Sequence, residues 1–227
     1  RREGGTRLRR RPRGGHPGAV SVRPFGEAAL LLELEQRIDP ALMDTARAIA
    51  DAWEARGLGE AVPAYASVLL RFDPGRTARR DALAAANALD ADPPAATAPV
   101  AGRLIEIPTT YDGPDLADTA ARSGMSTAEL VALHTAREYR AFFLGFMPGL
   151  AYCGMLDPRI DAPRLASPRP RIPAGTVAVA AGQTLVYPVD SPGGWRLIGR
   201  TELRVFDPAR EPAALIRAGD RIRFVPR

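Results

Sequence analysis

Apolar residues recur at helical spacing in the clearest periodic segment of the chain. Successive apolar positions lie four, three and four residues apart, which places them on one face of a helix. These positions are Leu42, Ala46, Ile49 and Trp53. Asp39 is a favourable N-cap residue, Pro40 suits the first turn, and Gly57 is a stop signal. The pattern therefore predicts a helix over residues 40–55.

The remaining pattern of the first half predicts a small α/β unit. Residues 19–34 predict one or two strands, and residues 65–72 predict a strand closed by an Asp-Pro-Gly turn. Residues 77–90 predict an alanine-rich helix. Residues 91–102 are rich in Pro and Ala and poor in bulky side chains, which is typical of a linker. We therefore expect an N-terminal α/β domain over residues 19–90.

In the second half of the chain, the spacing of apolar residues changes from a helical period to alternation. Alternating apolar residues open it at 103–111, and a helix is predicted between Pro114 and Gly124. A second helix begins at Ser126, where Glu129 completes a capping box. Short alternating segments then predict strands at 139–146, 176–180, 184–187, 195–198, 202–206 and 220–225. Short strands separated by turns favour a β-barrel or a β-sandwich.

Pro and Gly occur frequently from residue 142 to residue 201, and aromatic and β-branched residues recur between them. Gly supplies backbone angles that other residues resist and Pro fixes φ, so the pattern indicates short strands joined by rigid turns. A flexible linker would be polar and would lack such aromatic residues. Because binding residues concentrate on ordered loops, this segment is the first candidate for a site.

Three arginines in that segment, Arg164, Arg169 and Arg171, are spaced by prolines. A stiff backbone would hold their guanidinium groups as an array that binds a carboxylate or a phosphate, and a solvated loop is the alternative. Gln183 and Thr184 offer an amide and a hydroxyl beside an exposed backbone, or they begin an ordinary strand.

A second set of candidates combines a turn with the histidine of the folded region. Ser191, Gly193, Gly194 and Trp195 either close over a ligand, with the indole as an apolar wall, or form a plain turn with a core Trp. His134 is either a base at a helix end or a packed core residue. The catalytic candidates are therefore His134 and Gln183, and the other residues of both sets are candidates for binding substrate or an anion.

Basic residues are concentrated at the N-terminus. Residues 1–13 carry seven of the 31 Arg and one of the 26 acidic residues, which leaves 24 Arg against 25 acids in the remainder. The body is therefore close to neutral, and we expect residues 1–18 to form a disordered basic tail. That tail is either solvated or contacts nucleic acid or an acidic membrane. For the body we expect neither a nucleic acid nor a membrane as partner.

All 31 basic residues are arginine, because the chain contains no lysine. That excludes a P-loop with its phosphate-binding lysine and an enzyme that uses a Schiff-base lysine. The single cysteine, Cys153, excludes an internal disulfide and is either a nucleophile paired with His134 or a small core residue. With no signal-peptide pattern and no apolar run approaching about 18 residues, we expect a cytoplasmic protein.

Four ordered motifs carry a resemblance to a known family: FFLGFMPGLAY, RIPAGTVAVAAGQT, YPVDSPGGW and LIGRT. They resemble the allophanate hydrolase subunit 1/KipI family, and the similarity extends over essentially the whole chain except the tail. The resemblance implies an α+β fold, in which a small N-terminal α/β domain precedes a cyclophilin-like β-barrel over residues 103–227. It implies no metal site.

The same resemblance implies membership of an ATP-dependent 5-oxoprolinase complex, which converts 5-oxo-L-proline, ATP and water to L-glutamate, ADP and phosphate. The alternatives are a KipI-type inhibitor of a sensor histidine kinase and a carboxyltransferase module of urea amidolyase. One implied partner is a second protein of the carboxyltransferase type, like the C subunit of 5-oxoprolinase or allophanate hydrolase subunit 2. The other is an A subunit of the LamB/YcsF type. ATP is expected on the assembled complex, and this chain is expected to be inactive alone. Biotin would have to come from another protein, because the chain lacks a biotin-carrier Met-Lys pair.

Overall fold

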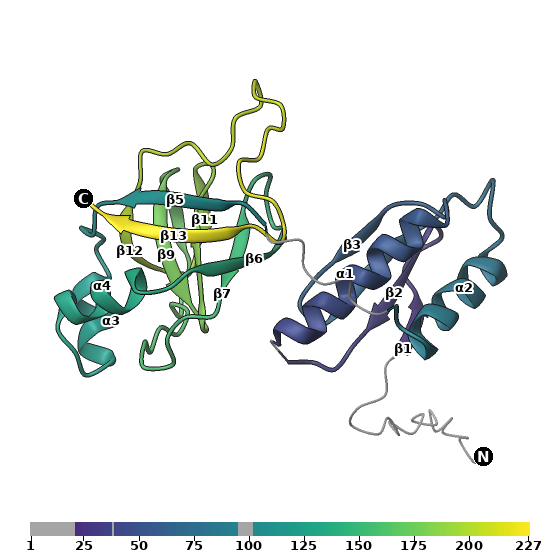
Figure 1. Ribbon diagram of the computed structural model, residues 1–227, viewed down its shortest axis with the longest axis horizontal. Helices are drawn as coiled ribbons and strands as arrows, with labels where there is room; N and C mark the ends of the chain where they lie inside the picture. Colours follow the sequence, from purple (N-terminus) through teal and green to yellow (C-terminus); the bar gives the residue numbers. More distant parts are fainter. Residues whose placement is uncertain (1–20, 38, 95–101) are drawn as a thin grey trace, which may run out of the picture.

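Residues 21–37, 39–94 and 102–227 are described by a computed structural model of the protein, drawn in Figure 1. The predicted basic tail lies outside these ranges, as does most of the predicted linker over residues 91–102.

Helix α1 (Pro40–Ala55) forms where the apolar spacing predicts it. The Asp39 carboxylate accepts a hydrogen bond from the Ala41 N–H at 2.8 Å and so satisfies one of the free donors of the first turn. On the apolar face, Ile49 and Trp53 are fully buried. The Trp53 indole N–H donates to the carbonyl of Arg71 at 2.9 Å, so this core ring also fixes the helix to a strand.

A four-stranded antiparallel sheet completes the N-terminal unit. Its strands are β1 (Ser21–Pro24), β2 (Ala29–Glu33), β3 (Ala61–Pro63) and β4 (Ser67–Arg71), in the order β1-β2-β4-β3. Helices α1 and α2 (Arg79–Ala91) lie on one face of this sheet (Figure 1). Alternate residues of the two central strands face the helices, and all four are fully buried: Leu30, Leu32, Val68 and Leu70.

A seven-stranded sheet forms the second unit. Its strands are β5 (Leu104–Thr109), β6 (Tyr139–Leu144), β7 (Ala151–Gly154), β9 (Thr176–Ala180), β10 (Gln183–Val186), β12 (Arg196–Arg200) and β13 (Arg221–Pro226). The order is β12-β9-β10-β7-β6-β13-β5, with β13 and β5 parallel and the other pairs antiparallel. Thr110 and Arg200 exchange two backbone hydrogen bonds of 2.9 Å, which join the two ends of this order. The sheet therefore closes into the predicted β-barrel of an α+β fold.

Two helices and a short ribbon complete the barrel. Helix α3 (Leu116–Arg122) and helix α4 (Thr127–Thr135) pack against β12 and β13, respectively (Figure 1). The capping box of α4 is confirmed, since the Ser126 hydroxyl and the Glu129 carboxylate each bond the other's backbone N–H. Strands β8 (Arg169–Ile172) and β11 (Ser191–Gly193) pair with each other as a separate two-stranded ribbon.

The strand predicted at 202–206 is wrong. This stretch is irregular, and only Phe206 makes an isolated bridge, to Ala214. Its alternation arises because Leu203 and Val205 pack inward from a loop. The guanidinium group of Arg210 holds that loop by donating to backbone carbonyls, including those of Arg204 and Val205. Strands β3, β7, β8 and β11 were not predicted, because each is short and bounded by Pro or Gly.

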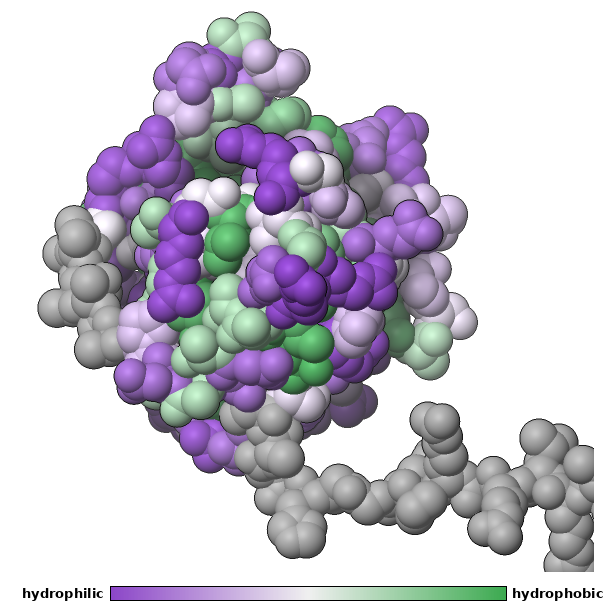
Figure 2. Space-filling view, turned by 90° about the vertical axis from the view of Figure 1, so that its right-hand side faces the viewer, coloured by the Kyte–Doolittle hydropathy of each residue, from purple (hydrophilic) through white to green (hydrophobic). Residues whose placement is uncertain are grey.

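Each unit has its own hydrophobic core, and polar contacts join them. Arg140 of β6 pairs with Asp44 of α1, and the Tyr65 hydroxyl, on the turn before β4, donates to the side-chain oxygen of Gln183 on β10. Figure 2 faces the end that carries the N-terminal unit, where hydrophilic side chains surround small apolar areas. Arginines of this unit pair locally, as Arg71 does with Glu60.

Candidate functional site

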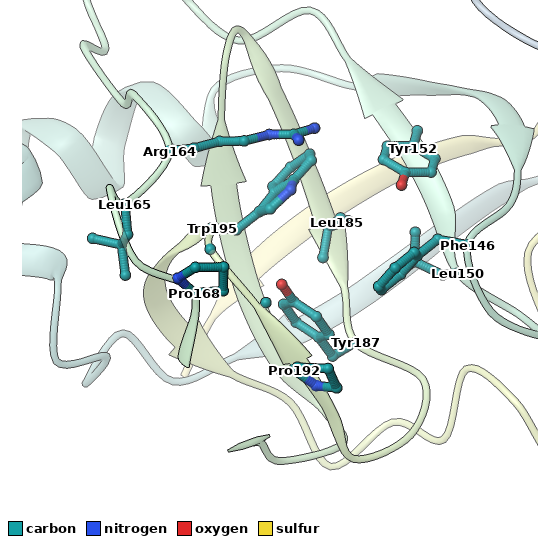
Figure 3. Close-up of a pocket in the computed structure, with 12 residues that line it drawn as sticks. Phe146, Leu150, Tyr152, Arg164, Leu165, Pro168, Leu185, Tyr187, Pro192 and Trp195 are labelled. Carbon is teal, nitrogen blue, oxygen red and sulfur yellow. The ribbon is translucent and has the colours of Figure 1, made fainter. Parts of the chain in front are cut away.

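A cavity of about 340 Å³ opens on the β-barrel beside the β8–β11 ribbon (Figure 3). Its walls come from strands β7 and β10, from the loop between β6 and β7, from the loop that precedes β8 and from the region of β11. The lining residues are Phe146, Leu150, Tyr152, Arg164, Leu165, Pro168, Leu185, Tyr187, Pro192, Gly193, Gly194 and Trp195. A volume of this size lies at the lower end of the range for small-molecule sites.

Aromatic rings form much of this lining. The Trp195 side chain is almost fully buried, and its ring centroid lies 5.9 Å from that of Tyr152. Tyr152 in turn stacks on Phe143, with ring centroids 4.8 Å apart. Burial raises the pKa of Tyr187 to about 12 and also raises the pKa of Tyr152, although the nearby Arg164 charge opposes the shift at both rings. Both hydroxyls are therefore neutral hydrogen-bond donors at pH 7.

Gly193 makes room for one of these hydroxyls. A Cβ at this position would lie 2.3 Å from the Tyr187 hydroxyl oxygen and 2.8 Å from Cδ1 of Ile172. Any side chain would therefore displace the phenol ring. At Gly194 a Cβ would meet its nearest atom only at 3.6 Å, so the requirement for glycine is local to Gly193.

Arg164 differs from the other two arginines of the predicted array. Its guanidinium carbon lies 5.9 Å from the centre of the Trp195 ring, a cation–π geometry. Arg164 makes no ion pair with a carboxylate of the described residues. Arg169, in contrast, pairs with Asp115, and Arg171 pairs with Asp190. Of the three, only Arg164 lines the cavity and offers it a positive charge.

Arg169 and Arg171 each pair with a carboxylate of this chain. Arg169 donates to Oδ1 of Asp115 at 2.7 Å, and Oδ2 of the same carboxylate accepts from the Leu197 N–H at 2.7 Å. Arg171 donates to the exposed carboxylate of Asp190 at 2.6 Å. Both arginines lie on strand β8 and not on a solvated loop, and the expected array of three arginines is divided because only Arg164 lines the cavity.

His134 lies in the core, away from the cavity. Its Nδ1 lies 2.7 Å from the Tyr111 hydroxyl and its Nε2 lies 2.9 Å from the Thr184 hydroxyl. Because the Thr184 hydroxyl donates to the carbonyl of Ala178, it accepts from Nε2–H, which leaves Nδ1 to accept from Tyr111. Burial lowers the pKa of His134 to about 3, so the ring is neutral at pH 7, and both of its nitrogens have hydrogen-bond partners. The structure therefore places His134 in the core, and it places Thr184 on strand β10, as the second alternative for each residue expects.

Gln183 and Ser191 are also buried but lie outside the cavity lining. Gln183 is 2% exposed, and its side-chain oxygen accepts from Tyr65 while its nitrogen has no partner among the described residues. The Ser191 hydroxyl has no partner there either. Cys153 is 1% exposed, and burial raises the pKa of its thiol, so it is a core residue and not a nucleophile.

Sequence reasoning found Arg164, Gly193, Gly194 and Trp195 of this lining but missed the tyrosines. A usable signal existed for Tyr187, because alternation from Gln183 onward places Leu185 and Tyr187 on one face of β10 and its extension. No such signal existed for the packing of the lining residue Tyr152 beside Tyr65, because Tyr65 lies outside the lining and comes from the other unit. In the described part of the chain, no three His, Cys, Asp or Glu residues gather as they would to hold a metal ion, and no helix is long and apolar enough to span a bilayer.

Comparisons with known proteins identify relatives of this chain. The family described as carboxyltransferase domain, subdomain C and D, matches residues 20–216. The B subunit of 5-oxoprolinase from Escherichia coli O157:H7 is 51% identical over 127 residues, which cover 55% of this chain and 58% of that protein. The chain spans a little more than half the length of the curated relatives it matches first.

Two solved structures have the same fold. The crystal structure of TTHA0988 superposes with a TM-score of 0.77 at 38% identity, over 91% of this chain and 40% of that one. The urea amidolyase of Kluyveromyces lactis gives a TM-score of 0.72 at 17% identity, over 95% of this chain and 15% of that one. At that low identity the second likeness concerns the fold alone.

Proposed function

The chain belongs to the carboxyltransferase domain family, subdomain C and D, and within it we propose that the protein is a subunit of an ATP-dependent 5-oxoprolinase. The observation that carries this proposal is the 51% identity to the B subunit of a 5-oxoprolinase over 127 residues. The similarity to urea amidolyase is one of fold and does not favour carboxyl transfer over lactam hydrolysis.

The chemistry of the reaction explains what such a protein must contribute. A five-membered lactam resists hydrolysis because its amide is stabilised by resonance. Phosphorylation of the amide oxygen by ATP releases ADP and activates the carbonyl carbon. Water then adds to that carbon, and the ring opens as the C–N bond breaks and the nitrogen takes a proton. A second water hydrolyses the resulting acyl phosphate to the carboxylate and phosphate. Catalysis of this kind depends on positioning and on stabilising charge, so arginines, backbone N–H groups and neutral hydroxyls suffice.

ATP is proposed to bind to the assembled complex. The chain contains no lysine, so it has no P-loop lysine for the phosphates of ATP. The cavity offers one guanidinium group, which is too little positive charge for a triphosphate. We therefore assign the phosphate-binding groups to partner subunits and expect this chain to be inactive alone.

The proposed partners are a second protein of the carboxyltransferase type and an A subunit of the LamB/YcsF type. Support comes from the comparison with TTHA0988, since this chain corresponds to 40% of that longer polypeptide. A chain that matches one part of a larger protein is expected to work beside a counterpart of the remainder. Biotin is not required for lactam hydrolysis, and the chain has no lysine that could carry it.

Reconstitution tests this proposal. The chain is mixed with both partner subunits, and phosphate release from ATP is measured with and without 5-oxo-L-proline. We expect release that depends on the lactam and on all three components, with glutamate formed in equal amount. Activity of the purified chain alone would show that the assignment of ATP to partners is wrong, and an inactive complete mixture would contradict the proposal itself.

A further inference from the structure

We propose that the cavity on the barrel binds a small cyclic carboxylic acid, with the carboxylate on Arg164 and the ring against Trp195 and Tyr187. The inference rests on the proposed function only for the identity of the ligand, which is then 5-oxo-L-proline. It deepens that proposal because it assigns the recognition of this substrate to the present chain and to named residues.

The composition of the lining sets the chemical class of the ligand. Among the twelve residues that line the cavity, Arg164 is the one that carries a charge, and the rest are aromatic, aliphatic, proline or glycine. Such a site favours a compact body with apolar faces and a single anionic group. A polyphosphate or a dianion would lack the second cation that it needs.

Arg164 is held so that its hydrogen-bonding edge stays available. The backbone N–H of the next residue, Leu165, donates to the carbonyl of Gly194 at 2.7 Å, which fixes the loop to the β11 region. The Arg164 guanidinium carbon lies over the Trp195 ring, 5.9 Å from its centre (Figure 3), and no described residue accepts a hydrogen bond from the guanidinium N–H groups. Because no carboxylate of the described residues pairs with it, a ligand carboxylate can take both donors of one fork.

A tyrosine hydroxyl supplies a second point of contact. In Figure 3 the Tyr152 ring lies across the cavity from the backbone of Arg164. The Tyr187 hydroxyl packs next to Gly193, so Tyr152 is the better placed of the two tyrosines to reach a ligand. Both phenols stay protonated at pH 7, because burial raises their pKa values. A neutral hydroxyl donates to the carbonyl oxygen of a lactam, so the site can hold the carboxylate and the amide oxygen of one ring at once.

Binding to the purified chain tests the carboxylate contact directly. Titration calorimetry compares 5-oxo-L-proline with 2-pyrrolidinone, the same lactam without a carboxylate, on the wild type and on Arg164→Gln. We expect this substitution to weaken binding of the acid by roughly 10- to 100-fold, because it removes charge-assisted hydrogen bonds. Binding of 2-pyrrolidinone should be unchanged, which shows that the cavity is intact. Arg171→Gln, at an exposed arginine outside the lining, is the matched control and should bind both lactams as the wild type does.

Two results would overturn the inference: equal affinity of the wild type and Arg164→Gln for the acid, or no saturable binding of the acid by the wild type. The reconstituted complex separates this inference from the proposed function. If the complex is active and Arg164→Gln leaves its KM for 5-oxo-L-proline unchanged, the inference is wrong and the proposed function stands. If the complex is inactive, the proposed function fails, and the comparison of the two lactams on the chain still decides the inference.

Discussion

Replacing Arg169 with alanine should destabilise the barrel, although sequence reasoning placed this side chain in a substrate site. Its guanidinium group donates to Asp115, whose side chain is 10% exposed. The other oxygen of that carboxylate accepts from the Leu197 N–H on β12. The substitution therefore leaves a nearly buried carboxylate with a backbone donor but without its cation.

The size of the effect follows from this burial. Loss of a hydrogen bond to a charged group costs about 1.5–3 kcal/mol, and breaking a fully buried ion pair costs about 3–5 kcal/mol. Because the Arg169 side chain is 29% exposed, water can partly replace it, and we expect a loss of about 2 kcal/mol in the free energy of unfolding. For a chain of this size that loss lowers Tm by about 4–8 °C.

Arg171→Ala is the matched control. It removes an ion pair on the same strand, but both partners are exposed, at 78% and 44% of their side chains. Exposed pairs contribute about 0–1 kcal/mol, so this variant should remain close to the wild type. Urea unfolding followed by tryptophan fluorescence measures both variants, since Trp195 lies next to β12. Equal destabilisation by the two substitutions, or a larger effect of Arg171→Ala, would refute the reasoning.

Three further predictions test the core and the cavity wall. The pKa of His134 falls to about 3 in the folded state from 6.5, so its stabilising effect is present above about pH 6.5 and is lost as the pH falls towards 3. Unfolding measurements should show a decline of about 2 kcal/mol from pH 7 to pH 5 that His134→Gln lacks; equal slopes would contradict this. Gly193→Ala should push Tyr187 into the cavity, lower stability by about 1–3 kcal/mol in urea unfolding and weaken lactam binding, whereas Gly194→Ala should keep wild-type stability. Cys153 should react with a thiol reagent only after denaturation, and rapid reaction of the native protein would disprove its burial.

The elements that the sequence predicted correctly are those with local signals. The N-cap, the apolar spacing and the stop signal of helix α1 all lie within the helix or next to its ends, and α4 has a complete capping box. Closure of the barrel depends on the pairing of Thr110 with Arg200, which lie far apart in the chain and carry no local signal. The error at 202–206 has the same origin, because alternation reports which side chains face the core and not whether a strand pairs.

The candidate site shows where sequence reasoning reaches its limit. Sequence reasoning treated Arg164, Arg169 and Arg171 as one array because prolines space them, but the role of each arginine depends on which carboxylate the fold brings beside it. Asp115 precedes its arginine by 54 positions, so the pairing could not be predicted from spacing. Tyr152 likewise depends on the aromatic ring of Tyr65 from the other unit, 5.8 Å away between ring centroids.

Complementation measures the central claim most directly. A bacterium that lacks the B subunit of its own 5-oxoprolinase, and keeps the other subunits, receives the protein that contains this chain, and consumption of 5-oxo-L-proline as the nitrogen source is measured. The account predicts that the wild type restores growth and formation of glutamate. It also predicts that Arg164→Gln restores growth only at raised 5-oxo-L-proline and that Arg171→Gln behaves as the wild type. Failure of the wild type to restore consumption, while the protein is folded and bound to the other subunits, would contradict the account.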